Sequence, residues 1–389
     1  MSLVATRLQN WRINNPDFDK NMTRPYEYGA LDFFTSQTDA PNSIISPFLR
    51  DRAFASIGNT VQIPVINYDG DVTVSNVRSC VIADDENTSA LYTVVFTTYA
   101  VGFTMVPSLY MNNEISYDHD FARKMEKVSR ALATSLDQAA VAALAAQKTQ
   151  VFTNPLNYTI TANVMQVPEQ MATECIGDIN PIMRANAYPG QIHIIGNAGV
   201  DSLMRKLAQH GLYNDVNKQL EYDGKVFHFT NNVTDEAIKN GTFYAVEDGN
   251  VGLLTRVDRE ALRNTKANFH EWGVTMLPYI DTEVGYHYYT AVGDQSSIAG
   301  DASADMTCNV KEYFGFSLDA AFVVAYNSAP ATVANPIIKA EIAARDANVP
   351  FAMPVRVVGT VTTEAAQSKT LILPIVSMSG VWGQPCTPT

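Results

Sequence analysis

The segment from Tyr117 to Gln147 constrains the fold of this chain more than any other feature. Apolar residues recur there in steps of three and four, at Phe121, Met125, Val128, Leu132, Leu136, Ala140 and Leu144. This spacing predicts one apolar face of an α-helix, which Asp118 can cap at its N-terminus. At 1.5 Å per residue, roughly 30 residues form a rod about 45 Å long. Because no partner heptad repeat accompanies it, we interpret the segment as a single long helix and not as a coiled coil.

The residues before this helix have the pattern of a long β-hairpin, expected over residues 51–107. Apolar residues alternate from Val61 to Val65, Asp69-Gly70 is a strong turn signal, and Leu91–Val106 is rich in strand-favouring residues. Pro64 cannot donate a backbone hydrogen bond, so its strand is expected at a sheet edge. An isolated two-stranded ribbon is only marginally stable in water. We therefore expect this hairpin to lie against another chain.

The first fifty residues show no sustained periodicity. Asn14-Asn15-Pro16, Pro25 and Pro41-Asn42 interrupt any regular element. We expect residues 1–50 to form an extended arm with little fold of its own, held in place by something outside its own domain.

Beyond Pro155 the pattern is mixed, and the predicted fold class of the whole chain is α+β. Gln191–Gly196 reads as a short buried strand, followed by a helix that Asn197 caps. A second ribbon is expected from Gly273 to Val292, and a late strand over Ala320–Tyr326. The remaining expectations concern the C-terminal part: a helical stretch near Ile337–Ala347 and strands at Val355–Val361 and Thr370–Met378.

Charge and cysteine content exclude several classes of function. The formal net charge is −13, and the stretches 79–122 and 267–310 contain no Lys or Arg, which argues against a protein that grips nucleic acid. The four cysteines, at positions 80, 175, 308 and 386, are far apart and indicate neither a zinc site nor a disulfide framework. Neither a signal peptide nor an apolar run of membrane-spanning length is present, so we expect a cytoplasmic product.

Candidate catalytic or metal-binding patterns are sparse. Asp118-His119-Asp120 is better explained as a helix cap with dipole partners, and His270-Glu271 lacks the second His of a helical zinc motif. In Tyr286–Tyr289, His287 and Tyr289 share a strand face, which favours sheet packing over ligand binding. Gly196–Gly199 opens a helix but lacks the residues of a nucleotide-binding loop. We expect no enzyme activity, no metal and no cofactor.

This order of parts resembles the major capsid proteins of tailed bacteriophages, which have the Hong Kong 97 fold. The phrases Gln191–Asn197 with the following helix, and Ala320–Tyr326, are similar to the axial strand–helix and the late peripheral strand of that family. The resemblance covers roughly residues 1–327. It implies this organisation: N-terminal arm (1–50), extended β-hairpin loop (51–107), peripheral domain with the long spine helix (108–166), axial domain (167–257), return strands (258–328) and a C-terminal addition (329–389).

The resemblance also implies a function and a set of partners. Copies of the chain would assemble as pentamers and hexamers into an icosahedral shell that encloses double-stranded DNA without sequence-specific binding. The other expected partners are a separate scaffolding protein, a portal and auxiliary capsid proteins, and the expected location is the virion, assembled in the bacterial cytoplasm. The residues proposed to serve assembly are Tyr68, Asp69, Gly70, Asp84, Asp85, Glu86, Phe121, Met125, Val128, Leu132 and Leu136.

Two departures from the family pattern lead to further expectations. Some relatives cross-link their shells through a lysine of the extended loop, but no lysine occurs here between Lys20 and Lys124, so such a link is excluded. We also expect no proteolytic removal of the N-terminus, because only about fifty residues precede the hairpin. The alternative functions left open are a host nanocompartment shell protein, a soluble α+β hydrolase, and a phage tail-tube or decoration protein.

Overall fold

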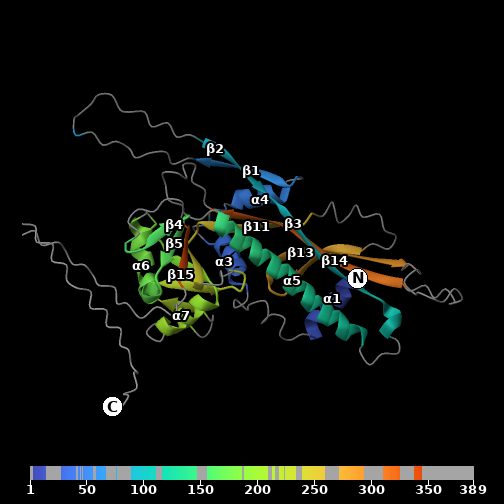
Figure 1. The fold of residues 1–389 in the computed structure, drawn as a ribbon. Helices are drawn as coiled ribbons and strands as arrows, with labels where there is room; N and C mark the ends of the chain where they lie inside the picture. Colours follow the sequence, from blue (N-terminus) through green and yellow to red (C-terminus); the bar gives the residue numbers. More distant parts are fainter. Residues whose placement is uncertain are drawn as a thin grey trace, which may run out of the picture. The chain divides into compact units, whose positions relative to one another are not determined.

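The fold is seen in a computed structural model, and the predicted α+β class is confirmed (Figure 1). The structure describes residues 3–14, 28–40, 43, 45, 47–55, 58–66, 76, 89–110, 116–146, 156–185, 188–208, 213–214, 219–222, 224–233, 239–258, 271–292, 310–324 and 337–343. All of them belong to one compact unit, residues 1–344. Within these ranges no helix combines the length and the hydropathy that crossing a bilayer requires.

The larger sheet of the described residues has eight strands and is mostly antiparallel, with parallel pairs β6–β9 and β5–β15. Its strands, in spatial order, are β4 (Thr159–Thr161), β5 (Val164–Val167), β15 (Ile337–Ala343), β10 (Lys239–Glu247), β6 (Ile192–Gly196), β9 (Lys225–Phe229), β8 (Gln219–Tyr222) and β7 (Tyr213–Asn214).

The middle of this sheet is buried on both faces, as the side chains that alternate along β10 show. Phe243 and Ala245 pack in one core with α6 (Ala172–Ala185) and α7 (Ala198–Ala208), while Tyr244 and Val246 pack in a second core on the other face. Successive strand side chains point to opposite faces, so one strand serves both cores. Helix α7 is capped as predicted, because the Asn197 side chain accepts the Val200 amide at 3.4 Å.

A second sheet has five strands, in the order β11 (Val251–Arg256), β14 (Val310–Val324), β13 (Ile280–Val292) and β12 (Glu271–Leu277), with β3 (Thr97–Met105) also paired to β14. β12 and β13 form the ribbon predicted over Gly273–Val292, and β14 contains residues 320–324 of the predicted late strand, whose last two residues lie outside the described part. Short 3₁₀ turns lie at Pro107–Tyr110 and Glu169–Met171.

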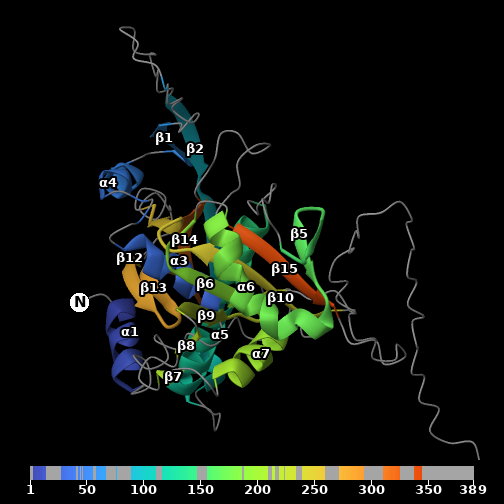
Figure 2. The same ribbon diagram turned by 90° about the vertical axis from the view of Figure 1, so that its left-hand side faces the viewer.

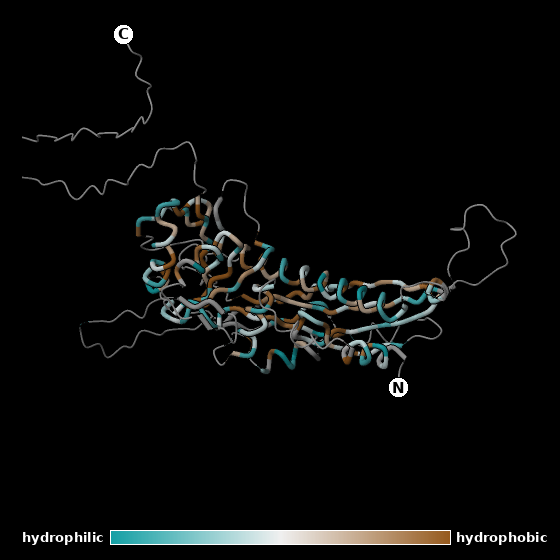
Figure 3. Tube along the Cα trace, turned by 90° about the horizontal axis from the view of Figure 1, so that it is seen from below, coloured by the Kyte–Doolittle hydropathy of each residue, from teal (hydrophilic) through white to brown (hydrophobic). Residues whose placement is uncertain are grey.

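The long helix α5 (Tyr117–Ala146) is confirmed almost to the residue, and it lies across β3 and β14 (Figure 1). Phe121, Met125, Val128, Leu132 and Leu136 are all buried beneath it. Burying each such side chain contributes roughly 1.5–3 kcal/mol, so the apolar stripe holds the helix on the sheet. The turns of this helix pass repeatedly from hydrophilic to hydrophobic residues (Figure 3). The hydroxyl of Ser116, and not Asp118, accepts a first-turn amide, that of His119, at 3.3 Å.

The expected extended arm is wrong for its described part. Residues 1–50 contain α1 (Leu3–Asn14), α3 (Gly29–Thr38) and the start of α4 (Pro47–Ala55). Phe33 and Phe34 of α3 are completely buried in the chain's own core. The N-terminal segment is thus held by its own subunit, because two large aromatic side chains leave water there.

The expected helix at Ile337–Ala347 is also wrong in its described part. Ile337–Ala343 is the strand β15, placed between β5 and β10 inside the larger sheet. The segment expected as an addition therefore supplies an interior strand. The strands expected at Val355–Val361 and Thr370–Met378 lie outside the described residues.

Candidate assembly surface

The first hairpin forms a separate two-stranded sheet, β1 (Thr60–Ile66) with β2 (Ser89–Val95), among the described residues. Pro64 pairs with Leu91, and β2 is the one strand that pairs with β1 among the described residues, so the predicted edge position is confirmed. The single strand expected over Leu91–Val106 is divided at Phe96, where the chain passes from β2 into β3. Figure 2 shows the β1–β2 ribbon directed away from the two larger sheets.

At the base of this ribbon, where its side chains are described, one face is covered by its own subunit. Val61 and Val94 are buried in a small cluster with Phe96 and side chains from α4, β11 and β14. Val95, on the opposite face from Val94, is 59% exposed. The expectation that the whole ribbon lacks cover is therefore wrong at its base, while the face that carries Val95 is open.

Helix α3 positions this region, because polar contacts attach both of its ends. At its start, Asp137 of α5 accepts the Leu31 amide at 2.9 Å and the Asn232 side-chain amide at 2.7 Å, and it also accepts the Thr230 hydroxyl. Burial raises the pKa of this carboxyl, against the opposing effect of these donors. One carboxylate thus joins the spine helix, α3 and the end of β9.

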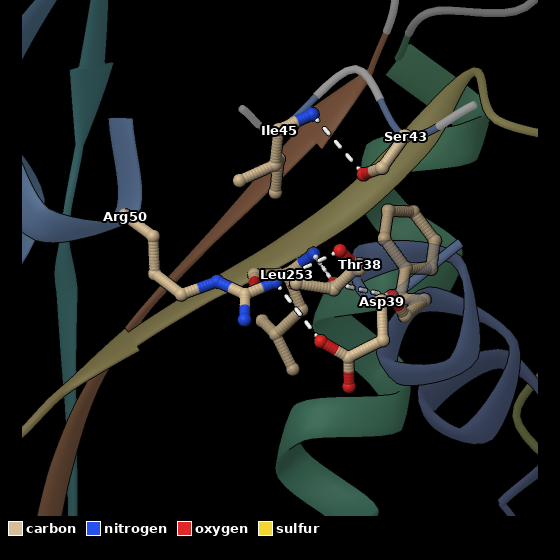
Figure 4. A network of polar contacts seen from close by, with 7 residues as sticks. Thr38, Asp39, Ser43, Ile45, Arg50 and Leu253 are labelled. Carbon is tan, nitrogen blue, oxygen red and sulfur yellow. Dashed lines mark hydrogen bonds and ion pairs between the residues drawn. The ribbon is translucent and has the colours of Figure 1, made fainter. Parts of the chain in front are cut away.

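The other end of α3 is attached to β11 and α4 (Figure 4). The Thr38 hydroxyl accepts the Leu253 amide at 2.8 Å, and Arg50 donates to the Thr38 carbonyl at 2.9 Å and to Asp39 at 3.0 Å. Because Arg50 belongs to α4, which packs against β1, α3 connects the spine helix to the base of the ribbon. These contacts fix where the ribbon leaves the subunit.

Helix α1 is attached through a buried carboxylate of the five-stranded sheet. Glu312 accepts the Tyr288 hydroxyl at 2.9 Å, the Tyr117 hydroxyl, and Arg7 of α1 at 3.3 Å. Burial, followed by the hydrogen bond to Glu312, raises the pKa of Tyr288 and of Tyr117 above the usual value. Leu8 and Trp11 add apolar contacts.

The structure separates the predicted assembly residues into two groups. The five on α5 lie inside the subunit, so a neighbouring copy could not touch their side chains. The other six lie outside the described residues: Tyr68, Asp69, Gly70, Asp84, Asp85 and Glu86.

The candidate chemical patterns are structural where the structure describes them. Asp120 accepts the Tyr110 hydroxyl and pairs with Lys124 at 2.9 Å, and the Tyr110 contact is the main cause that lowers the pKa of this carboxyl. The ring of His287 stacks on that of Tyr289, with the ring centroids 6.2 Å apart, as expected for sheet packing. Among the described residues, no group of three or more His, Cys, Asp or Glu side chains could hold a metal ion.

Sequence reasoning missed Asp137 and Glu312, although one of them left a signal. Asp137 lies four residues after Ala133 and four before Val141, on the buried side of α5. A buried carboxylate needs hydrogen-bond donors, so an Asp on the apolar face of a predicted helix indicates buried donors from other segments. The position of Asp137 is therefore a signal that the sequence contains. No comparable pattern marks Glu312, because its partners come from three separate segments.

No protein-family model matches the chain, and no curated protein matches it. A solved structure from Mycobacterium phage Bobi is 15% identical, covers 82% of this chain and 91% of its own, and has a TM-score of 0.44. The capsid structure of Cyanophage P-SCSP1u is 9% identical, with 79% and 93% covered and a TM-score of 0.42. The capsid asymmetric unit of Cyanophage Pam1 is 10% identical, with 75% of this chain and 87% of its own covered and a TM-score of 0.43.

The chain is similar to phage capsid structures.

Proposed function

We propose that this chain is a structural, non-catalytic subunit that assembles with copies of itself into a closed protein shell, as the major capsid protein of a tailed phage. The open face of the β1–β2 ribbon is the observation that carries the proposal. The ribbon belongs to neither larger sheet, and Val95 on it is exposed. Because a two-stranded ribbon is marginally stable alone, contact with a neighbouring copy would stabilise it.

The wider proposal includes how the shell is held together and what it contains. The lattice is non-covalent, since residues 21–123 have no lysine that could supply a loop cross-link. The acidic chain encloses double-stranded DNA without gripping its phosphates, which would need clustered basic residues. A separate scaffolding protein, a portal and auxiliary proteins complete the particle. The axial domain comprises residues 167–257 together with β15, which pairs with β10 in the larger sheet.

Electron microscopy of the purified full chain tests this function. We expect closed shells, whereas tubes or monodisperse monomers would contradict the proposal. Val95→Asp is the informative variant, because the exposed side chain can be replaced without disturbing the subunit core. We expect it to yield folded, unassembled subunits.

Leu156→Asp is the matched control, because Leu156 is also an exposed apolar residue, at 51%, but lies just before β4 and far from the ribbon in sequence. We expect this variant to form shells as the unaltered chain does. Normal shells from Val95→Asp, or equal loss of shells from both variants, would show that the ribbon face does not mediate assembly.

A further inference from the structure

Two buried histidines lie directly under α3, on the face of the larger sheet that this helix covers. His193 of β6 and His228 of β9 are 3.0 Å apart, between Nδ1 of the first and Nε2 of the second. Phe33 of α3 packs on both rings, with centroid distances of 4.9 Å and 5.2 Å. Nε2 of His193 is 3.5 Å from Asp248 and makes no hydrogen bond within the described part of the chain.

The geometry of this pair restricts its charge. A hydrogen bond between two imidazoles needs one N–H donor and one unprotonated acceptor, so both rings cannot be protonated at 3.0 Å. A second ring proton on His228 would place a cation where almost no water reaches, since this residue is only 5% exposed. The pair is compatible with a docked α3 only while His228 is neutral.

Helix α3 is also attached in a way that permits local release. Asp137 attaches its start, Gln37 and Thr38 attach its end, and Phe33 covers the histidine pair. The strands that carry the histidines are held separately, through their own pairing with each other and with β10. Loss of α3 would therefore leave that sheet paired.

We propose that α3 is an acid-sensitive joint of the subunit, which leaves its place between α5 and the larger sheet when the His193–His228 pair is protonated. Release would uncouple the spine helix from the base of the ribbon, because α3 connects Asp137 to Arg50 and β11. The inference concerns a single subunit and holds whether or not the chain forms shells.

The other charged groups on the packed elements do not replace this pair. Burial lowers the pKa of His193, and the charge of Asp248, which faces it, partly opposes this effect. Lys225 and Glu247 lie on the opposite faces of their strands. Asp32 of α3 is exposed. Asp137 acts in the opposite direction, because a carboxyl with a raised pKa in the folded chain favours the folded state as the pH falls.

Desolvation, followed by the charge of His193, lowers the pKa of His228 from 6.5 to about 3. The docked state therefore binds this proton less readily than a state in which α3 has left and His228 is hydrated. Docking is most stable above pH 6.5 and weakens as the pH falls toward 3. For His228 alone, these two values raise the equilibrium for α3 release about 30-fold at pH 5 and about 300-fold at pH 4, and protonation of Asp137 opposes this rise.

Hydrogen exchange of the full chain, read by mass spectrometry at pH 7.5, 5 and 4, tests the proposal. Exchange rates are converted to protection factors at each pH, so that the intrinsic pH dependence of exchange is removed. We expect the protection factors of amides Phe33–Gln37 to fall at least tenfold more than those of β6, β9 and β10 between pH 7.5 and 4.

The double variant His193→Leu/His228→Phe removes the titrating groups and keeps an aromatic ring beside Phe33. We expect its α3 protection to change less than threefold, while the control His119→Gln, an exposed histidine of α5, behaves as the unaltered chain. Retained α3 protection at pH 4, simultaneous loss in helix and strands, or an unaltered response of the double variant would overturn the proposal. If the double variant does not fold, the comparison of helix and strands in the unaltered chain decides it.

Discussion

Truncation of Phe33 to alanine tests whether the N-terminal segment is a structural part of its own subunit. The side chain is completely buried, and it contacts Phe34, His193 and His228 with ring centroids 4.9–6.1 Å apart. A buried Phe→Ala change removes apolar contacts and leaves a cavity, at a cost of about 3–5 kcal/mol. Such a cost is a large part of the stability of an ordinary domain.

The expected shift in melting temperature follows from the size of the unit. Unfolding entropy is about 2.1 cal/mol/K per residue, which for a unit of 344 residues makes 1 kcal/mol equivalent to about 1.4 °C. Phe33→Ala should therefore lower the melting temperature by about 4–7 °C. Calorimetry at pH 7.5 measures this shift. Both chains are compared at the same protein concentration, because assembly makes the melting temperature depend on concentration.

Two further variants make this result specific. Phe33→Leu keeps most of the apolar volume and should cost less than half as much. Leu109→Ala changes an apolar side chain that is 68% exposed, and it should alter stability by at most about 0.5 kcal/mol. A Phe33→Ala chain that melts within 1 °C of the unaltered chain would refute the placement of α3 in the core.

Three more outcomes are expected. Glu312→Gln keeps the shape of the side chain but removes a buried negative charge that accepts hydrogen bonds from Arg7 and two tyrosines. It should lower the free energy of unfolding by about 2 kcal/mol and the melting temperature by about 3 °C, and an unchanged melting temperature would contradict this role. Gly29→Ala should be at least as costly, because its Cβ would lie 2.3 Å from the Phe229 carbonyl oxygen of β9, and increased protease cleavage within α3 would report the displacement. Burial raises the pKa of the Cys175 thiol to about 12, so peptide mapping should find it unmodified by iodoacetamide at pH 8 in the native chain and modified after unfolding in urea.

Local periodicity was sufficient where an element is long or has one buried face. The apolar stripe of α5 predicted its bounds to within one residue, because seven apolar residues in successive steps of three and four leave little ambiguity. The β12–β13 ribbon and the Asn197 cap were predicted for similar reasons, since turn residues and caps act within a few positions of the chain. The candidate assembly residues on α5 were real core positions, but periodicity cannot say whether a buried face meets its own chain or a neighbour.

The failures concern elements that tertiary contacts create. Ile337 and Ile338 of β15 face different cores, and an interior strand buried on both faces lacks the alternation that separates a strand from a helix. Helix α3 has only ten residues, too few to be stable alone, and it forms because Phe33 and Phe34 are buried against distant segments.

The amino-acid sequence by itself therefore determined the α+β class, the long helix, the two ribbons and the absence of clustered basic residues. Only the tertiary structure decided that the N-terminal segment belongs to its own subunit and that β15 lies inside the larger sheet. It also decided that Asp137, Glu312 and the histidine pair are buried together with their hydrogen-bond partners. The reason is physical: helix periodicity and caps depend on residues a few positions apart, whereas these contacts join segments about 35 to 300 residues apart, and their energy exists only after the chain has folded.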